Sequence, residues 1–429
     1  MKIAIISDFH LGAKEDGLRE EDPFEQAKEA VEKALELGAQ LILISGDIFD
    51  SRIPKQEVWS KGMRILSFAS EKKNRDVSLL DTIDKKRGDI TDLPFRGAPV
   101  IAIHGNHERR GKGFVDSIEA LESSGLVIRL HHNGVVLNSE GVNVAIQGMG
   151  YVPGEFAKDF LERWQPSPIE GSVNIFMLHQ GLGRFTYSAS ESSKLQPADL
   201  PEGFDLYISG HVHYKVESEV HGKPLIFPGS TFRTQLLPVE ARNPKGFYML
   251  ELTDESLDYE FVKLNSPRDF FYEKKEFERT NPLEVENWVR DKVNEFLQEK
   301  FENPDRRPLA RIRLVGSLSK GSSRSEINSK DIEAEFEDKI LLSITKEDLS
   351  SPELEEKTEF LRNIRKENIS MEERGLKILE SKLNDLNYDR RFDSSVLYDL
   401  LSGERTEEAL DEVMSEIDKI TEAKLEEES

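Results

Sequence analysis

The sequence lacks cysteine entirely, although it is 429 residues long. Disulfide bonds and thiolate metal sites are therefore excluded, and a metal ion can bind only to nitrogen and oxygen ligands. The sequence also lacks any apolar run close to the ~18 residues that cross a membrane. The charged and apolar regions of a signal peptide do not precede the first strand-like segment. We therefore expect a cytoplasmic protein that is not associated with a membrane.

Positive charge is scarce. The 58 lysines and arginines face 82 aspartates and glutamates, which gives a formal net charge of −24. So acidic a chain argues against a surface that binds nucleic acid over its whole extent. It leaves open a local basic patch, or phosphate binding through divalent cations.

The first 265 residues have the pattern of a layered α/β domain. Apolar segments typical of buried strands alternate with amphipathic helices, expected over residues 22–38 and 55–70. A charged stretch, residues 71–97, has the pattern of an insertion or a mobile loop. Shorter β segments follow from residue 126, so we expect two sheets or half-sheets flanked by helices.

The first helix begins with a capping pattern. Asp22 is the expected cap, Pro23 the first helical residue, and Glu25 the residue that completes a capping box. This pattern places the start of the helix at the end of the loop that follows the first strand.

Two smaller segments follow the first domain. Residues 270–348 predict a small β-α-β unit, and residues 353–425 are helical and acidic. The last helices begin with a capping pair and carry apolar stripes: Ser370, Glu373, Leu376, Leu379, Leu383, Leu386, Leu410, Val413, Met414, Ile417 and Ile420. Such stripes either pack within the chain or bind a helix or coiled coil of a partner.

Polar side chains that can bind metal follow five apolar segments, where each segment ends. The motifs are SDFHLG, GDIFD, GNHE, LHQG and GHVH, and their candidate residues are Asp8, His10, Asp47, Asp50, Asn106, His107, His179, His211 and His213. Each motif alone also fits a polar turn or a core histidine. Because ligands gather beyond the carboxyl ends of strands in α/β sheets, the five together predict one shared site.

The donor types and their number indicate a pair of metal ions. Mixed aspartate, histidine and asparagine ligands suit manganese, iron or zinc better than magnesium or calcium. Seven of these residues are the candidate ligands: Asp8, His10, Asp47, Asn106, His179, His211 and His213. Their number exceeds the coordination of a single ion and suits two ions bridged by one carboxylate. Paired ions about 3.5–4 Å apart activate water and stabilise the oxygens of a phosphoryl group during an in-line displacement.

This ordered set of motifs resembles that of the calcineurin-like metallophosphoesterases over about residues 1–235. SDFHLG, HQG and SGHVHYK running on to FPGSTFRT are in addition similar to the nuclease subunit of the Mre/Rad double-strand-break repair complex, the bacterial SbcC–SbcD type. The resemblance implies a nuclease domain (1–265), a cap or DNA-binding domain (270–348) and a helical segment (353–425) that binds a coiled-coil ATPase.

The family roles can be carried onto the matching positions. The resemblance implies one ion on Asp8, His10, Asp47 and His213, and a second on Asp47, Asn106, His179 and His211. It assigns His107 to proton transfer, because an imidazolium can protonate the leaving 3′ oxygen near neutral pH.

Asp50 departs from the pattern of many family members, which carry histidine three residues after the bridging aspartate. We interpret Asp50 as the acceptor of a hydrogen bond from His107, which would fix the tautomer of that ring and favour its charged form. The alternative is that Asp50 only caps a turn. Phe9 is a milder departure, since threonine is common between the two ligands of that motif.

Possible contacts to DNA are less sharply marked. Basic residues follow several motifs and recur in the second segment: Arg109, Arg110, Lys112, Arg184, Arg233, Arg306, Arg307, Arg311, Arg313, Lys320 and Arg324. Such clusters can bind backbone phosphates, and each residue can equally be solvated surface.

The resemblance also implies a homodimer through helices near residues 55–70 and 114–124. Apolar side chains on these helices are Val58, Ile65, Leu66 and Ile118, which fit a protomer core equally well. DNA and a coiled-coil repair ATPase of the Rad/SbcC type are the other expected partners, with nucleoid association when DNA is bound.

The resemblance leads us to expect a manganese-dependent DNA exonuclease and endonuclease with two Mn²⁺ ions per chain, acting in double-strand-break repair. The alternative enzyme is a calcineurin-like phosphodiesterase that acts on a nucleotide or another small phosphoester. A scaffold with a vestigial metal site is the third hypothesis. It is disfavoured because all seven ligand positions hold competent residue types.

Overall fold

The computed structural model describes residues 1–14, 17–71, 76–111, 113–186, 194–253, 256–350, 370, 373–378, 380, 394–403 and 405–415. The chain divides into two compact units. The first comprises Met1–Lys274, Val289–Arg313 and Ser329–Thr345, and the second comprises Lys275–Trp288, Leu314–Asn328 and Lys346–Ser429. The boundaries at residues 265, 270, 348 and 353 stay predictions.

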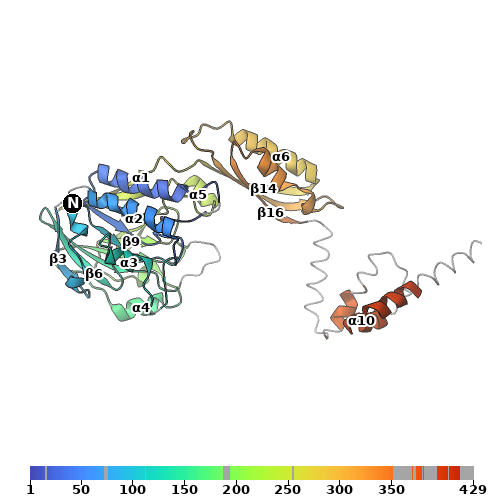
Figure 1. The fold of residues 1–429 in the computed structure, drawn as a ribbon, viewed down its shortest axis with the longest axis horizontal. Coiled ribbons are helices and arrows are strands. Elements are labelled where there is room, and N and C mark those ends of the chain that lie inside the picture. Colours follow the sequence, from blue (N-terminus) through green and yellow to red (C-terminus); the bar gives the residue numbers. More distant parts are fainter. Residues whose placement is uncertain are drawn as a thin grey trace, which may run out of the picture. The chain divides into compact units, whose positions relative to one another are not determined.

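Two sheets form the centre of the first unit (Figure 1). The six-stranded sheet has the order β13 (Leu257–Lys263), β12 (Gly246–Leu252), β1 (Lys2–Ile6), β2 (Leu41–Ile44), β4 (Val100–Ala102) and β5 (Ile128–Arg129). The seven-stranded sheet has the order β10 (Val216–Val220), β11 (Lys223–Phe227), β9 (Leu206–Gly210), β8 (Val173–His179), β7 (Val142–Met149), β6 (Asn133–Ser139) and β3 (Val77–Ile83).

Alternation along the central strands divides the core into layers. In β1, Ile3 and Ile5 join the apolar cluster between the two sheets, whereas Ala4 and Ile6 join the cluster beneath the helices. This follows from the twofold periodicity of a strand, which sends successive side chains to opposite faces. A third cluster lies on the outer face of the seven-stranded sheet.

Helices cover both outer faces. Helices α1 (Asp22–Glu36), α2 (Gln56–Glu71) and α3 (Ser117–Ser123) pack on the six-stranded sheet, and α4 (Ala157–Trp164) packs on the other. Figure 1 shows α4 on the opposite side of the sandwich from α1 and α2. The predicted layered α/β fold is confirmed.

Parallel strands bring the five motifs to one edge. Strands β1, β2, β4 and β5 run parallel in one sheet, and β7, β8, β9 and β11 run parallel in the other. The motifs follow β1, β2 and β4 in one sheet and β8 and β9 in the other, so each sheet presents its motifs at the carboxyl ends of its parallel strands.

Two local expectations differ from the structure. Asp22 is not the cap of α1: Glu21 precedes the helix, and no side chain caps it. The Asp22 carboxylate instead accepts hydrogen bonds from Arg268 at 2.9 Å and Arg306 at 3.1 Å, because two guanidinium groups compete successfully with a backbone amide.

The stretch between α2 and β4 contains a strand rather than only a loop. Strand β3 pairs antiparallel with β6 at the edge of the seven-stranded sheet, with a register shift between Leu79 and Asp81. Its sequence, VSLLDTI, lacks strict alternation, and because its neighbour β6 supplies the pairing, the sequence pattern alone did not reveal it.

The expected dimer side chains are core residues of the protomer. Val58, Ile65, Leu66 and Ile118 are all at most 6% exposed and belong to the cluster beneath the helices. Of the two interpretations that the sequence allowed for these side chains, the structure shows the core.

A small three-stranded sheet has the order β14 (Phe270–Thr280), β15 (Leu309–Leu318) and β16 (Leu341–Ser350), with helices α6 (Pro282–Phe296) and α7 (Ser329–Glu335) in the same segment. Asn281 accepts a hydrogen bond from the Glu284 amide at 2.9 Å and so caps α6. The short helix α5 (Pro238–Arg242) connects β11 to β12.

The described part of the C-terminal segment includes α10 (Ser394–Ser402) and helical residues 373–378 and 406–415. Ser370 and Glu373 form the expected reciprocal cap, with distances of 2.8 and 3.1 Å. Leu379, Leu383, Leu386, Ile417 and Ile420 lie outside the described residues. None of the helices that the structure describes is long and apolar enough to cross a membrane.

Candidate metal centre

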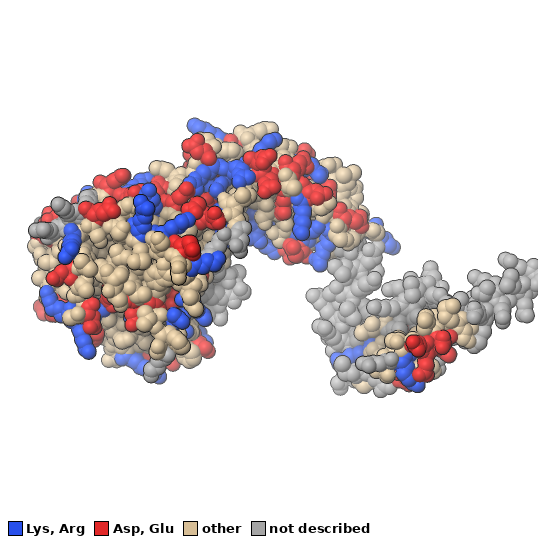
Figure 2. Space-filling view, viewed as in Figure 1, with Lys and Arg blue, Asp and Glu red and all other residues tan. Residues whose placement is uncertain are grey.

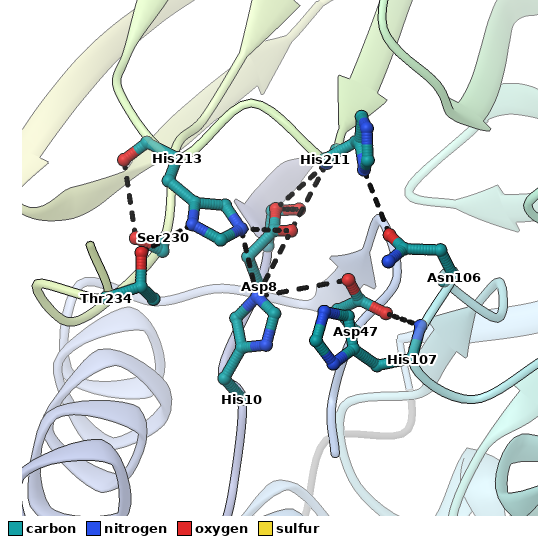
Figure 3. A network of polar contacts seen from close by, with 12 residues as sticks. Asp8, His10, Asp47, Asn106, His107, His211, His213, Ser230 and Thr234 are labelled. Carbon is teal, nitrogen blue, oxygen red and sulfur yellow. Dashed lines mark hydrogen bonds and ion pairs between the residues drawn. The ribbon is translucent and has the colours of Figure 1, made fainter. Parts of the chain in front are cut away.

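Residues that follow β1, β2, β4 and β9 converge at the carboxyl ends of the strands (Figure 3), and His179, at the end of β8, contacts Asp47. Four of the seven candidate ligands have positive φ: Asp8 at 53°, His10 at 47°, Asp47 at 51° and His211 at 77°. Such conformations are uncommon for residues other than glycine and cluster at functional sites. These strained backbone conformations turn the four side chains toward one another.

Glycines make the close approach possible. At Gly46, a Cβ atom would lie 2.3 Å from Nδ1 of His179, and at Gly105 it would lie 2.0 Å from Oδ1 of Asp47. Neither distance is sterically possible, so the loops that carry these ligands require glycine at both positions.

One group of donors comes from β1 and the loop after β9. Nε2 of His213 lies 3.5 Å from Oδ1 of Asp8, and Nε2 of His10 lies 3.8 Å from the same oxygen. The two Nε2 atoms are 3.0 Å apart. Two imidazole nitrogens and a buried carboxylate oxygen thus face one point.

A second group comes from β8 and the loops after β4 and β9. Nε2 of His179 and Nδ1 of His211 lie 3.1 and 2.9 Å from Oδ1 of Asn106. Nδ1 of His179 lies 2.7 Å from the carbonyl oxygen of Ser45. That contact fixes the ring and leaves Nε2 directed into the site.

Asp47 lies between the two groups. Its Oδ2 is 3.2 Å from Nε2 of His179 and 3.9 Å from Nε2 of His10. Its Oδ1 accepts a hydrogen bond from the His107 amide at 3.0 Å, whereas the buried Oδ2 faces an imidazole nitrogen of each group. A buried carboxylate is costly unless protonated imidazoles or a metal cation balance its charge. The donor set therefore fits two cations that share Asp47.

The electrostatics of the site also demand positive charge. Burial opposes ionisation of Asp8, yet hydrogen bonds to His10 and His213 hold its pKa well below the usual value. Burial lowers the pKa of His10, but the carboxylates of Asp50 and Asp8 outweigh it and raise the pKa to about 10. Burial lowers the pKa of His179, but the carboxylates of Asp47 and Asp8 outweigh it and raise the pKa to about 9. Protons or metal cations must balance these buried carboxylates.

Asp50 lies elsewhere than expected. Its Oδ1 is 2.8 Å from Nδ1 of His10 and 3.5 Å from Nδ1 of His107. Nδ1 of His107 instead lies 2.9 Å from the backbone carbonyl oxygen of Asp50. Residues 47–50 turn so that the backbone carbonyl faces His107, while the side chain reaches the loop after β1. Asp50 thus orients His10 and contacts His107 mainly through its backbone.

Sequence reasoning missed two polar side chains that support the site. Glu108 is fully buried and accepts hydrogen bonds from the amides of Phe49 and Gly105, both at 2.9 Å. It therefore ties the loop of Asp47 to that of Asn106. The glutamate in GNHE was the available signal for this role.

Thr234 is the second missed residue. Its Oγ1 lies 2.5 Å from Nδ1 of His213, although the two residues are 21 positions apart in the chain. No local spacing relates them, and only the folded loop after β11 brings them together.

The remaining histidines lie apart from the metal ligands. His104, His131 and His132 make edge-to-face contacts, His131 stacks on Phe160, and His221 bonds to the carbonyl oxygen of Leu200 at 2.8 Å. These contacts are those of structural histidines.

Several basic candidates for DNA contact are engaged within the protein. Arg233 donates to the carbonyl oxygens of Arg268 and Glu240, and Arg306 binds Asp22. Arg109, two residues after His107, is exposed. On the face shown in Figure 2, basic and acidic side chains are interspersed.

The sequence pattern of the calcineurin-like phosphoesterases matches residues 1–215. The chain is 31% identical over 357 residues to the DNA double-strand break repair protein Mre11 of Methanopyrus kandleri, with 78% of this chain and 68% of that protein covered. The chain belongs to the Mre11 family of calcineurin-like phosphoesterases. This membership confirms the predicted family and shows that the chain is a phosphodiesterase of the nuclease type.

More distant relatives carry the same description. Identity to Mre11 of Sulfolobus acidocaldarius is 24% over 327 residues, covering 74% of this chain and 76% of that protein. Identity to the double-strand break repair protein MRE11 of Homo sapiens is 25% over 366 residues, covering 73% of this chain and 50% of that protein. The chain thus spans about half the length of the human relative.

Proposed function

We propose that this protein is a manganese-dependent DNA nuclease, with exonuclease activity on double-stranded DNA and endonuclease activity, that acts in double-strand-break repair. The observation that carries the proposal is the convergence of seven nitrogen and oxygen donors from five strand ends around one shared carboxylate. The relatives named as double-strand break repair proteins support DNA as the substrate.

The proposed roles are those that the resemblance implies, and the distances between the donor atoms support them. Asp8, His10, Asp47 and His213 would hold one ion, and Asp47, Asn106, His179 and His211 would hold the other. Two such ions supply electrostatic stabilisation of the phosphoryl oxygens and activate water. Nδ1 of His107 contacts the carbonyl oxygen of Asp50, which leaves Nε2 as the nitrogen that transfers a proton to the leaving 3′ oxygen.

The decisive experiment compares two substrates. Purified protein is incubated with Mn²⁺ and either linear double-stranded DNA or a bis-nitrophenyl phosphate ester, with the Asp47→Asn variant as a control for contaminating nucleases. Cleavage of both substrates by the wild type alone is the expected result. Ester cleavage without DNA cleavage would favour the small-phosphoester alternative, and cleavage of neither would favour the scaffold.

Manganese is proposed because mixed aspartate, asparagine and histidine ligands suit it. The test loads metal-free protein with Mn²⁺, Mg²⁺ or Zn²⁺ and measures binding stoichiometry together with DNA cleavage. Two Mn²⁺ ions per chain and the highest turnover with Mn²⁺ are expected. Higher turnover with another ion at equal occupancy would reassign the metal.

A coiled-coil repair ATPase of the Rad/SbcC type is the proposed partner of the C-terminal helices. Leu410 and Met414, one helical turn apart, are 60% and 49% exposed, which leaves an apolar stripe on residues 406–415. Replacing both with glutamate should abolish co-purification with the co-expressed ATPase. Asp411→Asn with Glu412→Gln, on the same helix, is the matched control.

A homodimer is also proposed. Since the four apolar side chains first considered are buried, the contact would use exposed neighbours near α2 and α3, where Met63 is 38% and Phe114 is 65% exposed. Sedimentation of the wild type and of a Met63→Glu, Phe114→Glu variant tests this. An unchanged sedimentation coefficient would place the contact elsewhere or show a monomer.

A further inference from the structure

A buried ion pair lies just outside the metal centre. Nζ of Lys245 and Oε1 of Glu240 are 2.8 Å apart, and their side chains are only 2% and 1% exposed. Burying two charges is expensive, and apolar residues of similar volume often serve stability equally well. Glu240 lies in α5 and Lys245 follows that helix. Their positions in the sequence do not indicate a contact with any metal ligand.

The ammonium group of Lys245 donates hydrogen bonds to three neighbouring residues. Besides Glu240, Nζ donates to the carbonyl oxygen of His213 at 2.7 Å and to Oγ of Ser230 at 2.8 Å. An ammonium group has three protons, so its donors are fully used. Lys245 therefore holds the main chain of His213, 32 residues away, at a fixed distance from the start of β12.

Glu240 holds the loop that faces the His213 ring. Its carboxylate accepts hydrogen bonds from the amides of Thr234 at 3.2 Å and Gln235 at 3.0 Å. These contacts place Oγ1 of Thr234 2.5 Å from Nδ1 of His213 (Figure 3). One carboxylate thus positions the hydroxyl group that contacts the ring.

The two partners of the ion pair meet at a single imidazole. Lys245 fixes its backbone, and Glu240, through Thr234, fixes Nδ1. When the Thr234 oxygen accepts the Nδ1 proton, Nε2 keeps its lone pair, and Nε2 is the nitrogen that lies 3.5 Å from Asp8 Oδ1. We propose that Glu240 and Lys245 are positioning residues that orient His213 as a metal ligand through Thr234.

This inference rests on the proposed two-metal function and predicts which of the two ions the Thr234 hydroxyl supports. His213 belongs to the group of Asp8 and His10, whereas His179 and His211 belong to the group of Asn106. Loss of the Thr234 hydroxyl should therefore weaken one of the two ions and leave the other nearly unchanged. A purely structural ion pair would affect both sites alike, or neither.

Thr234→Val is the central variant, because it removes the hydroxyl and keeps the shape. Thr234→Ser retains the hydroxyl and should restore wild-type behaviour. The same loop offers a matched control at Thr231, whose Oγ1 is fully buried without a hydrogen-bond partner among the described residues. Thr231→Val changes the same atoms three residues away and should leave metal binding unchanged.

The measurement is Mn²⁺ binding to the full chain by titration calorimetry, with electron paramagnetic resonance to count bound ions. We expect two ions on the wild type, and about 10–100-fold weaker binding of one ion to Thr234→Val, as for other residues that orient a ligand. Glu240→Gln and Lys245→Met should shift the same ion in the same direction. Melting temperatures of the metal-free proteins separate this shift from unfolding.

A second readout does not involve metal. In the metal-free protein, long-range ¹H–¹⁵N spectra report the tautomer of each imidazole. Thr234→Val should change the His213 signals, and Thr234→Ser and Thr231→Val should not. This comparison keeps the inference testable even if the two charged variants fail to fold.

The outcomes separate the inference from the function on which it rests. If the wild type binds two ions but Thr234→Val binds both with unchanged affinity and keeps the His213 tautomer, the inference is overturned and the function stands. If Thr234→Val weakens both ions equally, the pair is structural and the inference is again overturned. If the wild type itself fails to bind two ions, the proposed function fails first.

Discussion

The two halves of the metal centre orient their histidines by different means. In the half that contains His10 and His213, Nδ1 of each ring contacts a side chain, the carboxylate of Asp50 or the hydroxyl of Thr234. In the other half, Nδ1 of His179 contacts the backbone carbonyl oxygen of Ser45, and Nδ1 of His211 contacts Asn106, which is itself a candidate ligand. A backbone acceptor cannot be removed by substitution, whereas a side-chain acceptor can.

This difference shows which contacts of the metal ligands a substitution can change. His179 ends strand β8, and Ser45 directly follows β2, so packing of the two sheets fixes their contact. His10 and His213 lie in loops and depend on further loops that carry Asp50 and Thr234. Substitution of Asp50 or Thr234 should therefore weaken one ion through residues that do not bind it, whereas the contact of His179 with Ser45 offers no such side chain.

The largest effect on metal binding and DNA cleavage should come from replacing Asp47, the carboxylate that both halves of the metal centre share. Asp47→Asn takes away the charge between both groups of ligands, so we expect loss of both ions and DNA cleavage at background level. Metal content and nuclease assays measure this. Asp199→Asn, a substitution in an ion pair distant from the ligands in sequence, is the control. Two ions retained at wild-type affinity would show that the halves are independent.

Substitution of His107 should affect chemistry without distinguishing the halves. His107→Gln is expected to lower kcat by about 10²–10⁴-fold, the usual contribution of a proton-transferring group, with both ions still bound. Single-turnover cleavage and metal titration provide the two readouts. His221→Gln serves as a control histidine. An unchanged kcat would remove His107 from the reaction.

Asp50→Asn should weaken the ion that is bound by His10 and His213. Because its carboxylate contacts His10 at 2.8 Å, we expect about 10–100-fold weaker binding of one ion. The interpretation drawn from the sequence, in which Asp50 acts on His107, predicts instead that turnover suffers much more than metal content. Metal titration decides between these, since an intact pair of ions with low turnover would return Asp50 to a role on His107.

The smallest effect concerns stability in acid. Burial alone would raise the pKa of Glu240, but Lys245 outweighs it and lowers the pKa to about 2 from an ordinary 4.5. Since the folded-state pKa is depressed, the ion pair stabilises the fold above pH 4.5, and this contribution is lost as the pH falls toward 2. Denaturant unfolding between pH 6 and pH 3 measures it. Glu240→Gln should flatten this part of the profile, and an equally steep profile in the variant would assign the loss to other carboxylates.

The fold could be predicted from the sequence wherever its pattern was locally consistent. Apolar segments such as LILI marked buried parallel strands, and the face of α1 with Ala27, Val31 and Ala34 is buried as its periodicity predicted. The prediction failed where a tertiary partner decided the outcome. Strand β3 forms because β6 lies beside it, and Asp22 binds arginines more than 240 residues away instead of capping its helix.

The residues of the candidate site could be found because parallel strands deliver their ends to one edge. Asp8, Asp47 and His179 needed only that rule and their residue types. The supporting residues needed the fold, because no spacing relates Thr234 to His213 or Lys245 to the carbonyl oxygen of His213.

The sequence by itself determined which side chains gather beyond the strand ends and that metal can be bound only through nitrogen and oxygen. The tertiary structure alone decided how those side chains are oriented. In the folded chain the Asp50 carboxylate contacts His10, and Thr234 contacts His213. The physical reason is that residue type and strand order depend on local periodicity, whereas a hydrogen bond of 2.5–3.0 Å depends on where distant loops finally pack.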